Sequence, residues 1–264
     1  MILLGLQPTP TPSTEPPAVE GSHDGGCYGR EEACCTLHSA LGDSRQWDRQ
    51  IAALRDDFDV VAPDLPGFGT EPMPTEPFSF VDAVMGLLPA SLVGNSLGGG
   101  IALRAALLDP ARVDRLVLVG SGLPDWEWSD EMRGYFAREE EAVARGDIEA
   151  AVEVNMEFWV APDHRDELRP MQRRALELQT AHDEPKVVWP ELPPLETLSV
   201  PTLVIVGDRD KDDFQRIARR ITDSVTGARL EVVAGADHLV GVERPDELNR
   251  LLAGFLAEDA GVPE

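Results

Sequence analysis

Gly94-Asn95-Ser96-Leu97-Gly98-Gly99 is the stretch of this chain that decides its fold. It lies between a short apolar run that ends at Val93 and a run with helical spacing that begins at Ile101. A serine with a glycine two residues before it and another two residues after it, between a strand and a helix, matches the nucleophile-elbow pattern Gly-x-Ser-x-Gly. At such an elbow the serine backbone is strained, and side chains at Gly94 and Gly98 would collide with the neighbouring strand and helix. The alternative interpretation of this one motif is a glycine-rich phosphate-type turn or an ordinary strand–helix loop.

The length and composition of the chain suit one sizeable domain. Its 264 residues, 42% of them hydrophobic, can form a single α/β core with room for an insertion. No apolar run approaches the ~20 residues that a membrane span needs. The first residues, Met1 to Leu6, lack the basic residues and the length of a signal peptide. We therefore expect a cytoplasmic protein that does not associate with membranes.

The formal net charge of −25 is the most unusual feature of the composition. A surface with this excess of carboxylates repels nucleic acids and anionic membranes. No nucleic-acid or membrane partner is therefore expected. Independently of the charge, we expect a small-molecule substrate and a monomer or homodimer.

The cysteines of the chain do not predict a disulfide framework or a metal site. Cys27, Cys34 and Cys35 lie close to His23 and His38, but their spacing lacks the Cys-x2-Cys pairs that are typical of zinc sites. We interpret the thiols as buried or incidental.

Apolar runs alternate with helical runs along most of the chain, which predicts a mostly parallel central sheet flanked by helices on both faces. The expected strands are 33–37, 58–62, 91–93, 116–119, 202–206 and 230–233, and the expected helices are 47–54, 78–88, 97–108, 214–221 and 246–256. Residues 1–30 are rich in proline and small polar residues, which indicates a disordered leader. Residues 125–195 carry helical patterns without a strand, so we expect a helical cap inserted into a core formed by residues 31–124 and 196–264.

A serine nucleophile needs a base, and the base needs a carboxylate that orients it. In an open α/β sheet such groups lie on loops that follow the carboxyl ends of the strands. The loop after the strand at 202–206 carries Asp208 and Asp210, and the loop after the strand at 230–233 carries His238. The chain order Ser96, Asp210, His238 is nucleophile, acid and base.

Taken together, these motifs resemble the α/β-hydrolase superfamily, in particular its serine hydrolases with a helical cap that cleave esters and lactones. The stretches that carry the resemblance are Leu37-His38-Ser39, Trp47, Ala62-Pro63-Asp64-Leu65-Pro66-Gly67-Phe68-Gly69, the elbow, Pro201 to Asp210, and Gly235 to Leu256. The resemblance implies that Ser96 is the nucleophile and that His238 is the base. It implies Asp210 as the acid, and Asp208 is the nearest competitor for that role.

The resemblance also implies an oxyanion hole formed by two backbone N–H groups. One belongs to Leu97, directly after the nucleophile, and the other to Ala40, in the loop after the strand at 33–37. The family usually has His-Gly at the start of that loop, whereas this chain has His38-Ser39. We interpret His38 as a structural residue of the loop.

The reaction that the resemblance implies is hydrolysis of a small or medium carboxylic ester or lactone through an acyl-enzyme, with no metal or organic cofactor. Trp126, Trp128 and Trp159, all within the expected cap, are candidates for an apolar pocket wall over the serine; ordinary packing of the cap is the competing interpretation.

Two alternatives from other classes remain open. Asn95 before the serine resembles hydrolases that cleave carbon–carbon bonds in ring-fission products. A non-catalytic ligand-binding member of the fold is the second alternative, because a fold does not fix a function.

Overall fold

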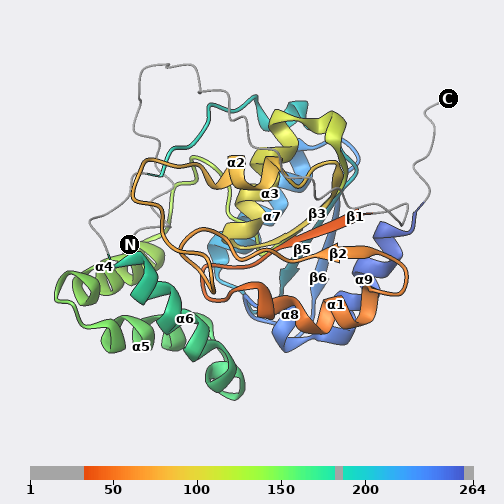
Figure 1. The fold of residues 1–264 in the computed structure, drawn as a ribbon. Helices are drawn as coiled ribbons and strands as arrows, with labels where there is room; N and C mark the ends of the chain where they lie inside the picture. The colour runs from red at the N-terminus through yellow and green to blue at the C-terminus, as the bar shows by residue number, and fades with distance from the viewer. Residues whose placement is uncertain (1–32, 182–186, 259–264) are drawn as a thin grey trace.

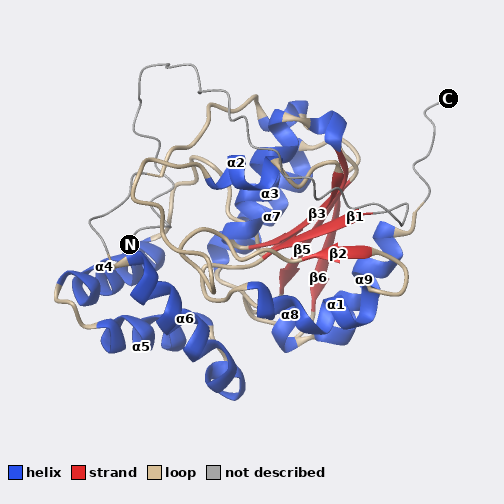
Figure 2. Cartoon of the chain, in the orientation of Figure 1, coloured by secondary structure: helices blue, strands red, loops and turns tan. Residues whose placement is uncertain are grey.

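The computed structural model describes residues 33–181 and 187–258, and a parallel sheet runs through the centre of this part of the chain (Figure 1). Its strands lie in the order β2-β1-β3-β4-β5-β6, and each neighbouring pair is parallel (Figure 2). The bounds of the strands are β1 Ala33–Leu37, β2 Asp59–Val61, β3 Ala90–Asn95, β4 Val113–Val119, β5 Thr202–Gly207 and β6 Arg229–Val233. The fold class predicted from the sequence is confirmed.

Helices cover both faces of the sheet. On one face lie α1 (Asp48–Leu54), α8 (Val240–Glu243) and α9 (Pro245–Leu256), and on the other lie α2 (Phe80–Met85), α3 (Leu97–Leu108) and α7 (Asp212–Ser224) (Figure 1). Short 3-10 helices span Ser44–Trp47, Pro110–Arg112, Pro162–His164 and Leu195–Thr197. Because side chains alternate along a strand, β4 sends Leu116 and Leu118 into the α3 side of the core and Val117 and Val119 into the α9 side.

Among the described residues between β4 and β5, three α-helices occur: α4 (Asp130–Ala144), α5 (Ile148–Trp159) and α6 (Arg165–Gln179). We call them the helical insert. They pack in sequence, α4 against α5 and α5 against α6, at one side of the sheet in Figure 1. Tyr135 stacks on Phe158 with ring centroids 4.4 Å apart, which joins α4 to α5. Ser129 caps α4 by accepting from the Met132 N–H, so the insert begins at a defined position.

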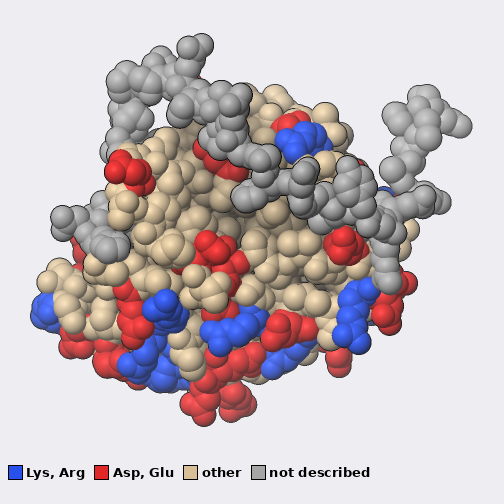
Figure 3. All heavy atoms as spheres, viewed as in Figure 1, with Lys and Arg blue, Asp and Glu red and all other residues tan. Residues whose placement is uncertain are grey.

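Acidic and basic side chains are interspersed along the lower edge of the face shown in Figure 3, whereas most of the rest of that face is uncharged. Several arginines bridge helices, such as Arg49 of α1 to Glu167 of α6 at 2.7 Å and Arg138 of α4 to Glu157 of α5 at 3.1 Å. Exposed pairs of this kind each contribute only about 0–1 kcal/mol. In the described ranges no helix is both long enough and apolar enough to cross a membrane.

The predicted elements agree with the structure to within a few residues at their ends. The short helix α8 was not expected, because Val240 to Glu243 gives too few residues for a periodic pattern. The predicted leader, residues 1–30, and with it Cys27 and His23, lies outside the described residues.

Candidate functional site

Ser96 lies at the sharp turn between β3 and α3 and has a strained backbone, with φ 53° and ψ −110°. A left-handed φ is unfavourable for a residue with a side chain, so neighbouring contacts must hold it there. The Ser96 N–H donates to the Val119 carbonyl at 2.9 Å, and the Ser96 carbonyl accepts from the N–H groups of Gly100 and Gly122. The end of β3 and the loop after β4 therefore fix the serine together.

Gly94 and Gly98 are needed because the elbow is packed tightly on two sides. A Cβ at Gly94 would lie 2.3 Å from the carbonyl oxygen of Gly98, and a Cβ at Gly98 would lie 2.2 Å from that of Leu37. The first contact is with α3 and the second with β1, which are the collisions expected from the sequence.

His238 and Asp210 form a buried pair at the carboxyl ends of β5 and β6. The Nδ1 of His238 lies 2.9 Å from Oδ2 and 3.0 Å from Oδ1 of Asp210. The Lys211 N–H also donates to Asp210 Oδ1, at 2.7 Å. An Nδ1–H directed at a carboxylate leaves Nε2 as the basic nitrogen. The competitor Asp208 points elsewhere, because its Oδ1 accepts from the Gly235 N–H at 2.6 Å.

Aromatic rings surround the imidazole of His238. The ring centroid of Phe214 lies 4.3 Å from that of His238, and the centroid of Trp159 lies 4.5 Å away. Trp128 packs on Phe214 at 5.6 Å. The pair is buried, and a low local dielectric strengthens the charge interactions within it. Within the described residues Ser96 Oγ makes no hydrogen bond to His238.

The loop after β1 leaves one backbone N–H without an acceptor next to the elbow. The Ser39 N–H donates to Gln46 Oε1 at 3.0 Å, and the Leu41 N–H donates to Ser39 Oγ at 3.2 Å. Between them, Ala40 N–H has no acceptor in residues 33–181 and 187–258, and neither does the N–H of Leu97, the first residue of α3. Two such donors are what an oxyanion hole requires.

Gln46 connects this loop to the elbow. Its Oε1 also accepts from Ser39 Oγ at 2.7 Å, and its Nε2 donates to Asn95 Oδ1 at 2.7 Å. The Nδ2 of Asn95 in turn donates to the carbonyl oxygens of Val119, at 2.9 Å, and His238, at 3.4 Å. The Asn95 amide is thus fully engaged in joining the elbow to the oxyanion loop and to the histidine loop.

His38 has both ring nitrogens bonded to the backbone. Its Nδ1 lies 2.8 Å from the Ser39 carbonyl oxygen, and its Nε2 accepts from the Leu65 N–H at 3.0 Å. Burial lowers the pKa of His38, although the bond to Ser39 and the carboxylates of Asp64 and Asp43 oppose this shift. A neutral imidazole with both nitrogens in use serves as a structural bridge, as interpreted from the sequence.

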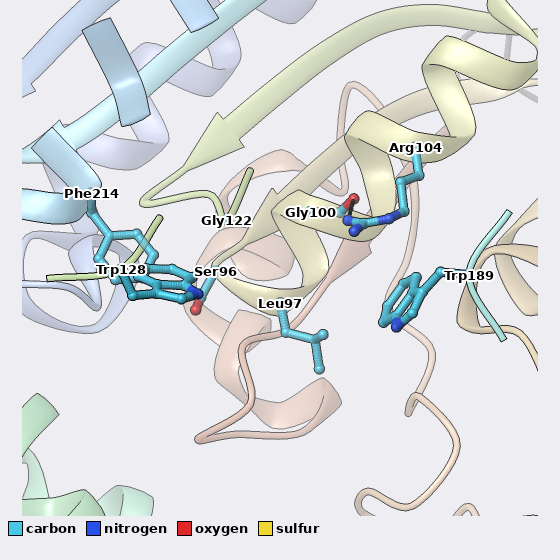
Figure 4. Close-up of a pocket in the computed structure, with 8 residues that line it drawn as sticks. All are labelled: Ser96, Leu97, Gly100, Arg104, Gly122, Trp128, Trp189 and Phe214. Atoms are coloured by element: carbon cyan, nitrogen blue, oxygen red, sulfur yellow. Dashed lines mark hydrogen bonds between the residues drawn. The ribbon is translucent and has the colours of Figure 1, made fainter. Parts of the chain in front are cut away.

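Two cavities meet near Ser96. The smaller one holds about 10 Å³, room for about one water molecule, and is lined by Ser96, Leu97, Gly100, Arg104, Gly122, Trp128, Trp189 and Phe214 (Figure 4). The larger one, of about 970 Å³, is open to solvent and shares Arg104 and Trp189 with the first. Arg104 and Trp189 therefore lie at the boundary between the two cavities.

A family model described as the alpha/beta hydrolase family matches residues 36–251, which is most of the chain. The chain belongs to the alpha/beta hydrolase family.

Individual relatives of this hydrolase have different activities. It is 28% identical over 240 residues to the carboxylesterase YbfK of Bacillus subtilis, with 83% of this chain and 78% of the relative covered. It is 30% identical over 226 residues to a 2-hydroxymuconate semialdehyde hydrolase of Pseudomonas sp. strain CF600, with 75% and 76% covered. Among solved structures, an enol-lactonase from Burkholderia xenovorans LB400 matches with a TM-score of 0.72 at 22% identity, covering 89% of this chain and 95% of that one. The last similarity shows the fold alone.

The three tryptophans expected to form one pocket wall lie at three different places in the hydrolase. Trp128 lines the small cavity beside Ser96, and Trp126 lines the larger cavity and donates to Asp213 at 2.9 Å. Trp159 instead packs against His238 and lines a separate cleft of about 210 Å³. Trp126 and Trp128 lie in the segment before α4, whereas Trp159 is the last residue of α5.

The sequence did not single out several residues that shape the site, namely Gln46, Gly120, Arg104, Trp189 and Phe214. The signal for Phe214 was its place in the helix that follows the acid loop. The signal for Arg104 was a cation inside the otherwise apolar run of α3, 97–108. Nothing in the local sequence indicates that Gln46 or Trp189 lies near Ser96.

No cluster of three or more potential metal-ligating side chains occurs in the described part of the hydrolase. Cys34 and Cys35 lie buried in β1. Burial raises the pKa of the Cys34 thiol to about 12, so this group stays protonated and inert at neutral pH.

Proposed function

We propose that this chain is a serine hydrolase that cleaves small or medium carboxylic esters or lactones through an acyl-enzyme. The observation that carries the proposal is the left-handed backbone of Ser96, with φ 53°, at a glycine-flanked elbow. Strain of this kind persists only where the surrounding structure maintains it, and it exposes the hydroxyl at the end of the strand.

In the proposed mechanism Ser96 Oγ attacks the carbonyl carbon while Nε2 of His238 takes its proton. For this transfer the two atoms must come within hydrogen-bond distance when substrate binds, as is common for sites that are loose without ligand. Asp210 holds Nδ1–H, which fixes the tautomer and stabilises the imidazolium. His238 then donates the proton to the leaving alkoxide.

The oxyanion that forms on the carbonyl oxygen is assigned to the N–H groups of Leu97 and Ala40. Removing one donor of such a pair typically lowers kcat by about 10²–10³-fold. The acyl-enzyme is then cleaved by water, which His238 deprotonates, and the carboxylic acid leaves. In this proposal the helical insert acts as a cap that closes over the substrate, with Trp128 as part of the wall.

The carboxylesterase relative supports ester cleavage, since it matches most of this chain. The closed set of hydrogen bonds among Gln46, Asn95 and Ser39 supports it as well, because it holds the oxyanion loop against the elbow.

The test is hydrolysis of p-nitrophenyl butyrate by the wild type and by Ser96→Ala. We expect the variant to lose about 10⁴-fold or more in kcat while its circular dichroism and Tm are unchanged. The matched control is Ser121→Ala, which removes a neighbouring buried hydroxyl that donates only to the Gly122 carbonyl. Unchanged turnover in Ser96→Ala would overturn the proposal, and saturable ligand binding without turnover would favour the non-catalytic alternative.

Carbon–carbon bond hydrolysis of a ring-fission product is a second candidate. It is favoured by the 2-hydroxymuconate semialdehyde hydrolase relative and by Asn95 before the nucleophile. The Asn95 amide is engaged by Gln46 and by two backbone carbonyls, an arrangement that suits either reaction. Incubation with a coloured ring-fission dienone acid separates the two: bleaching that depends on Ser96 supports this candidate, and stable colour eliminates it.

A further inference from the structure

Arg104 is a buried cation next to the proposed nucleophile. It lies on α3, and its side chain folds back along the helix so that Nη1 donates to the Gly100 carbonyl at 3.0 Å. A Cβ at Gly100 would lie 3.4 Å from Nη1, an ordinary contact distance, so the guanidinium packs closely against this turn of the helix. The guanidinium carbon lies 4.3 Å from the ring centroid of Trp189. The charged group is therefore held one helical turn from Ser96.

Arg104 forms no direct ion pair within the part of the chain that the structure describes, and the carboxylate of Asp125 acts on it without contact. Only 3% of the residue is exposed, yet it forms no ion pair there, and its Nε is buried without an acceptor. Burial lowers the pKa of Arg104 to about 10, with the carboxylate of Asp125 opposing the shift. The group is thus still cationic at neutral pH. A buried cation without a direct ion-pair partner destabilises a fold, so its presence beside a cavity points to an anionic ligand.

The position of Arg104 gives it access to a ligand. Arg104 and Trp189 line both the small cavity at Ser96 and the larger cavity of about 970 Å³. Figure 4 shows them at one end of the small cavity, with Ser96, Trp128 and Phe214 at the other. A molecule that extends from Ser96 toward the large cavity must pass the guanidinium. The large cavity also contains Arg220, but that residue already pairs with Glu196 at 3.5 Å.

We propose that Arg104 binds a carboxylate of the substrate, so that the preferred substrates are esters or lactones whose acyl part carries a second, ionised carboxyl group. This inference rests on the proposed function. A guanidinium presents several N–H donors in a plane that matches a carboxylate, and Nε is the donor left free here.

The spacing along α3 limits the length of the substrate. The guanidinium is bonded at Gly100, four residues after Ser96, and four residues rise about 6 Å along a helix. The acyl chain must therefore extend along roughly one turn of α3 before its second carboxylate reaches the guanidinium. An extended adipoyl chain has this reach.

A purely structural role for Arg104, stacking on Trp189, is the competing explanation. It predicts that Arg104 contributes to stability without discriminating between charged and neutral acyl groups. The two explanations therefore differ in substrate preference, not in stability.

The experiment compares kcat/KM for mono-p-nitrophenyl adipate and for p-nitrophenyl hexanoate, which have acyl chains of equal carbon number. We expect the wild type to prefer the adipate half-ester by about 10-fold or more, and Arg104→Gln to lower that ratio by about 10-fold or more. Arg104→Lys, which retains the charge, should restore part of the ratio. Equal or greater kcat/KM for hexanoate in the wild type, or an unchanged ratio in Arg104→Gln, would overturn the proposal.

The matched control is Arg115→Gln. Arg115 is also a buried arginine beside an aromatic ring, with its guanidinium carbon 5.6 Å from the ring centroid of Phe255, but it lies outside both cavities. We expect this variant to keep the wild-type ratio even where its Tm falls. A ratio that falls equally in Arg115→Gln and in Arg104→Gln would assign the effect to stability and contradict the proposal.

A binding measurement separates this inference from the proposed function. In Ser96→Ala, which lacks the proposed nucleophile, monomethyl adipate should raise the Tm and dimethyl adipate should not. Equal shifts with both esters, or none, would overturn carboxylate binding at Arg104. Failure of the wild type to hydrolyse either p-nitrophenyl ester would instead count against the proposed function, whatever the Tm result.

Discussion

Oδ2 of Asp210 lies 2.9 Å from Nδ1 of His238, and the two side chains are almost completely buried. The pair comes from loops after β5 and β6, which are adjacent in the sheet, so the topology brings together residues 28 positions apart. Gly120 lies against the pair from the loop after β4: a Cβ there would be 3.2 Å from Asp210 Oδ2 and from His238 Nδ1.

Asp210→Asn should reduce kcat for ester hydrolysis by about 10⁴-fold with little change in fold. An amide at this position can hold the imidazole in the wrong tautomer, which leaves Nε2 protonated and unable to act as base. The matched control is Asp208→Asn, because Asp208 accepts from the Gly235 N–H and an asparagine can do the same. Steady-state kinetics of the two variants check this. A larger loss of kcat in Asp208→Asn than in Asp210→Asn would show that Asp208, and not Asp210, is the acid.

Gln46→Leu should lower kcat by about 10–100-fold with a smaller effect on KM. Gln46 holds the loop that carries the Ala40 N–H, through bonds to Ser39 and Asn95, and a misplaced donor weakens binding of the oxyanion rather than of the substrate. Gln50→Leu is the control, since Gln50 is a buried amide on α1 that donates to Gly241 instead. Equal kcat values for Gln46→Leu and the wild type would argue against an oxyanion role for this loop.

Gly98→Ala should destabilise the protein by about 3 kcal/mol or more and abolish activity. The added Cβ would lie 2.2 Å from the Leu37 carbonyl oxygen, so β1 or α3 must shift. Gly134→Ala offers the opposite expectation, because no atom lies within 4 Å of a Cβ at this exposed position in α4. That variant should be more stable by about 0.5–1 kcal/mol. Urea unfolding of both variants measures these changes, and a stable, active Gly98→Ala would contradict the packing at the elbow.

The stability of the fold should fall as the pH drops from about 7 to 5, and His38 should account for part of this fall. Burial lowers the pKa of His38 in the folded state, whereas in the unfolded chain this histidine has its ordinary pKa of about 6.5. The unfolded state therefore binds more protons below that pH, so acid favours unfolding, and the effect grows until the lowered folded pKa is reached.

His38→Gln should flatten this pH dependence, because an amide can bond both the Leu65 N–H and the Ser39 carbonyl without titrating. Thermal unfolding at several pH values gives the slope of stability against pH. The control is His164→Gln, in the short 3-10 helix between α5 and α6. An identical slope in His38→Gln and the wild type would mean that His38 takes up its proton in the folded protein as readily as in the unfolded one.

The local sequence predicted much of the fold because the strands of a doubly covered parallel sheet are short apolar runs. Ala33–Leu37 and the helix Leu97–Leu108 were predicted at their observed bounds. Ser96 and His238 could be singled out because each follows a strand within a recognisable turn. The resemblance implied Asp210 as the acid with Asp208 as its competitor, because both lie in the same loop. Only the three-dimensional course of that loop shows that the Asp210 carboxylate faces His238.

The residues that shape the cavities could not be predicted in this way. Trp189 reaches the site from the loop before β5, and its contact with Arg104 joins segments that no periodic pattern relates. Trp159 was a candidate for a pocket wall over the serine, with ordinary packing of the cap as the alternative. It packs on His238, because its direction depends on how α5 packs against α4 and α6. Cavity shape depends on contacts between distant segments, whereas the elbow and its strands depend on neighbours in the chain.

The most direct test of the account is labelling of the purified protein with a fluorophosphonate, followed by peptide mass mapping. We expect one adduct, on Ser96, because only an activated serine hydroxyl attacks such a probe. Labelling should be absent in Ser96→Ala and much slower in Asp210→Asn. No adduct on Ser96 in protein shown to be folded by circular dichroism would contradict an activated nucleophile at this elbow.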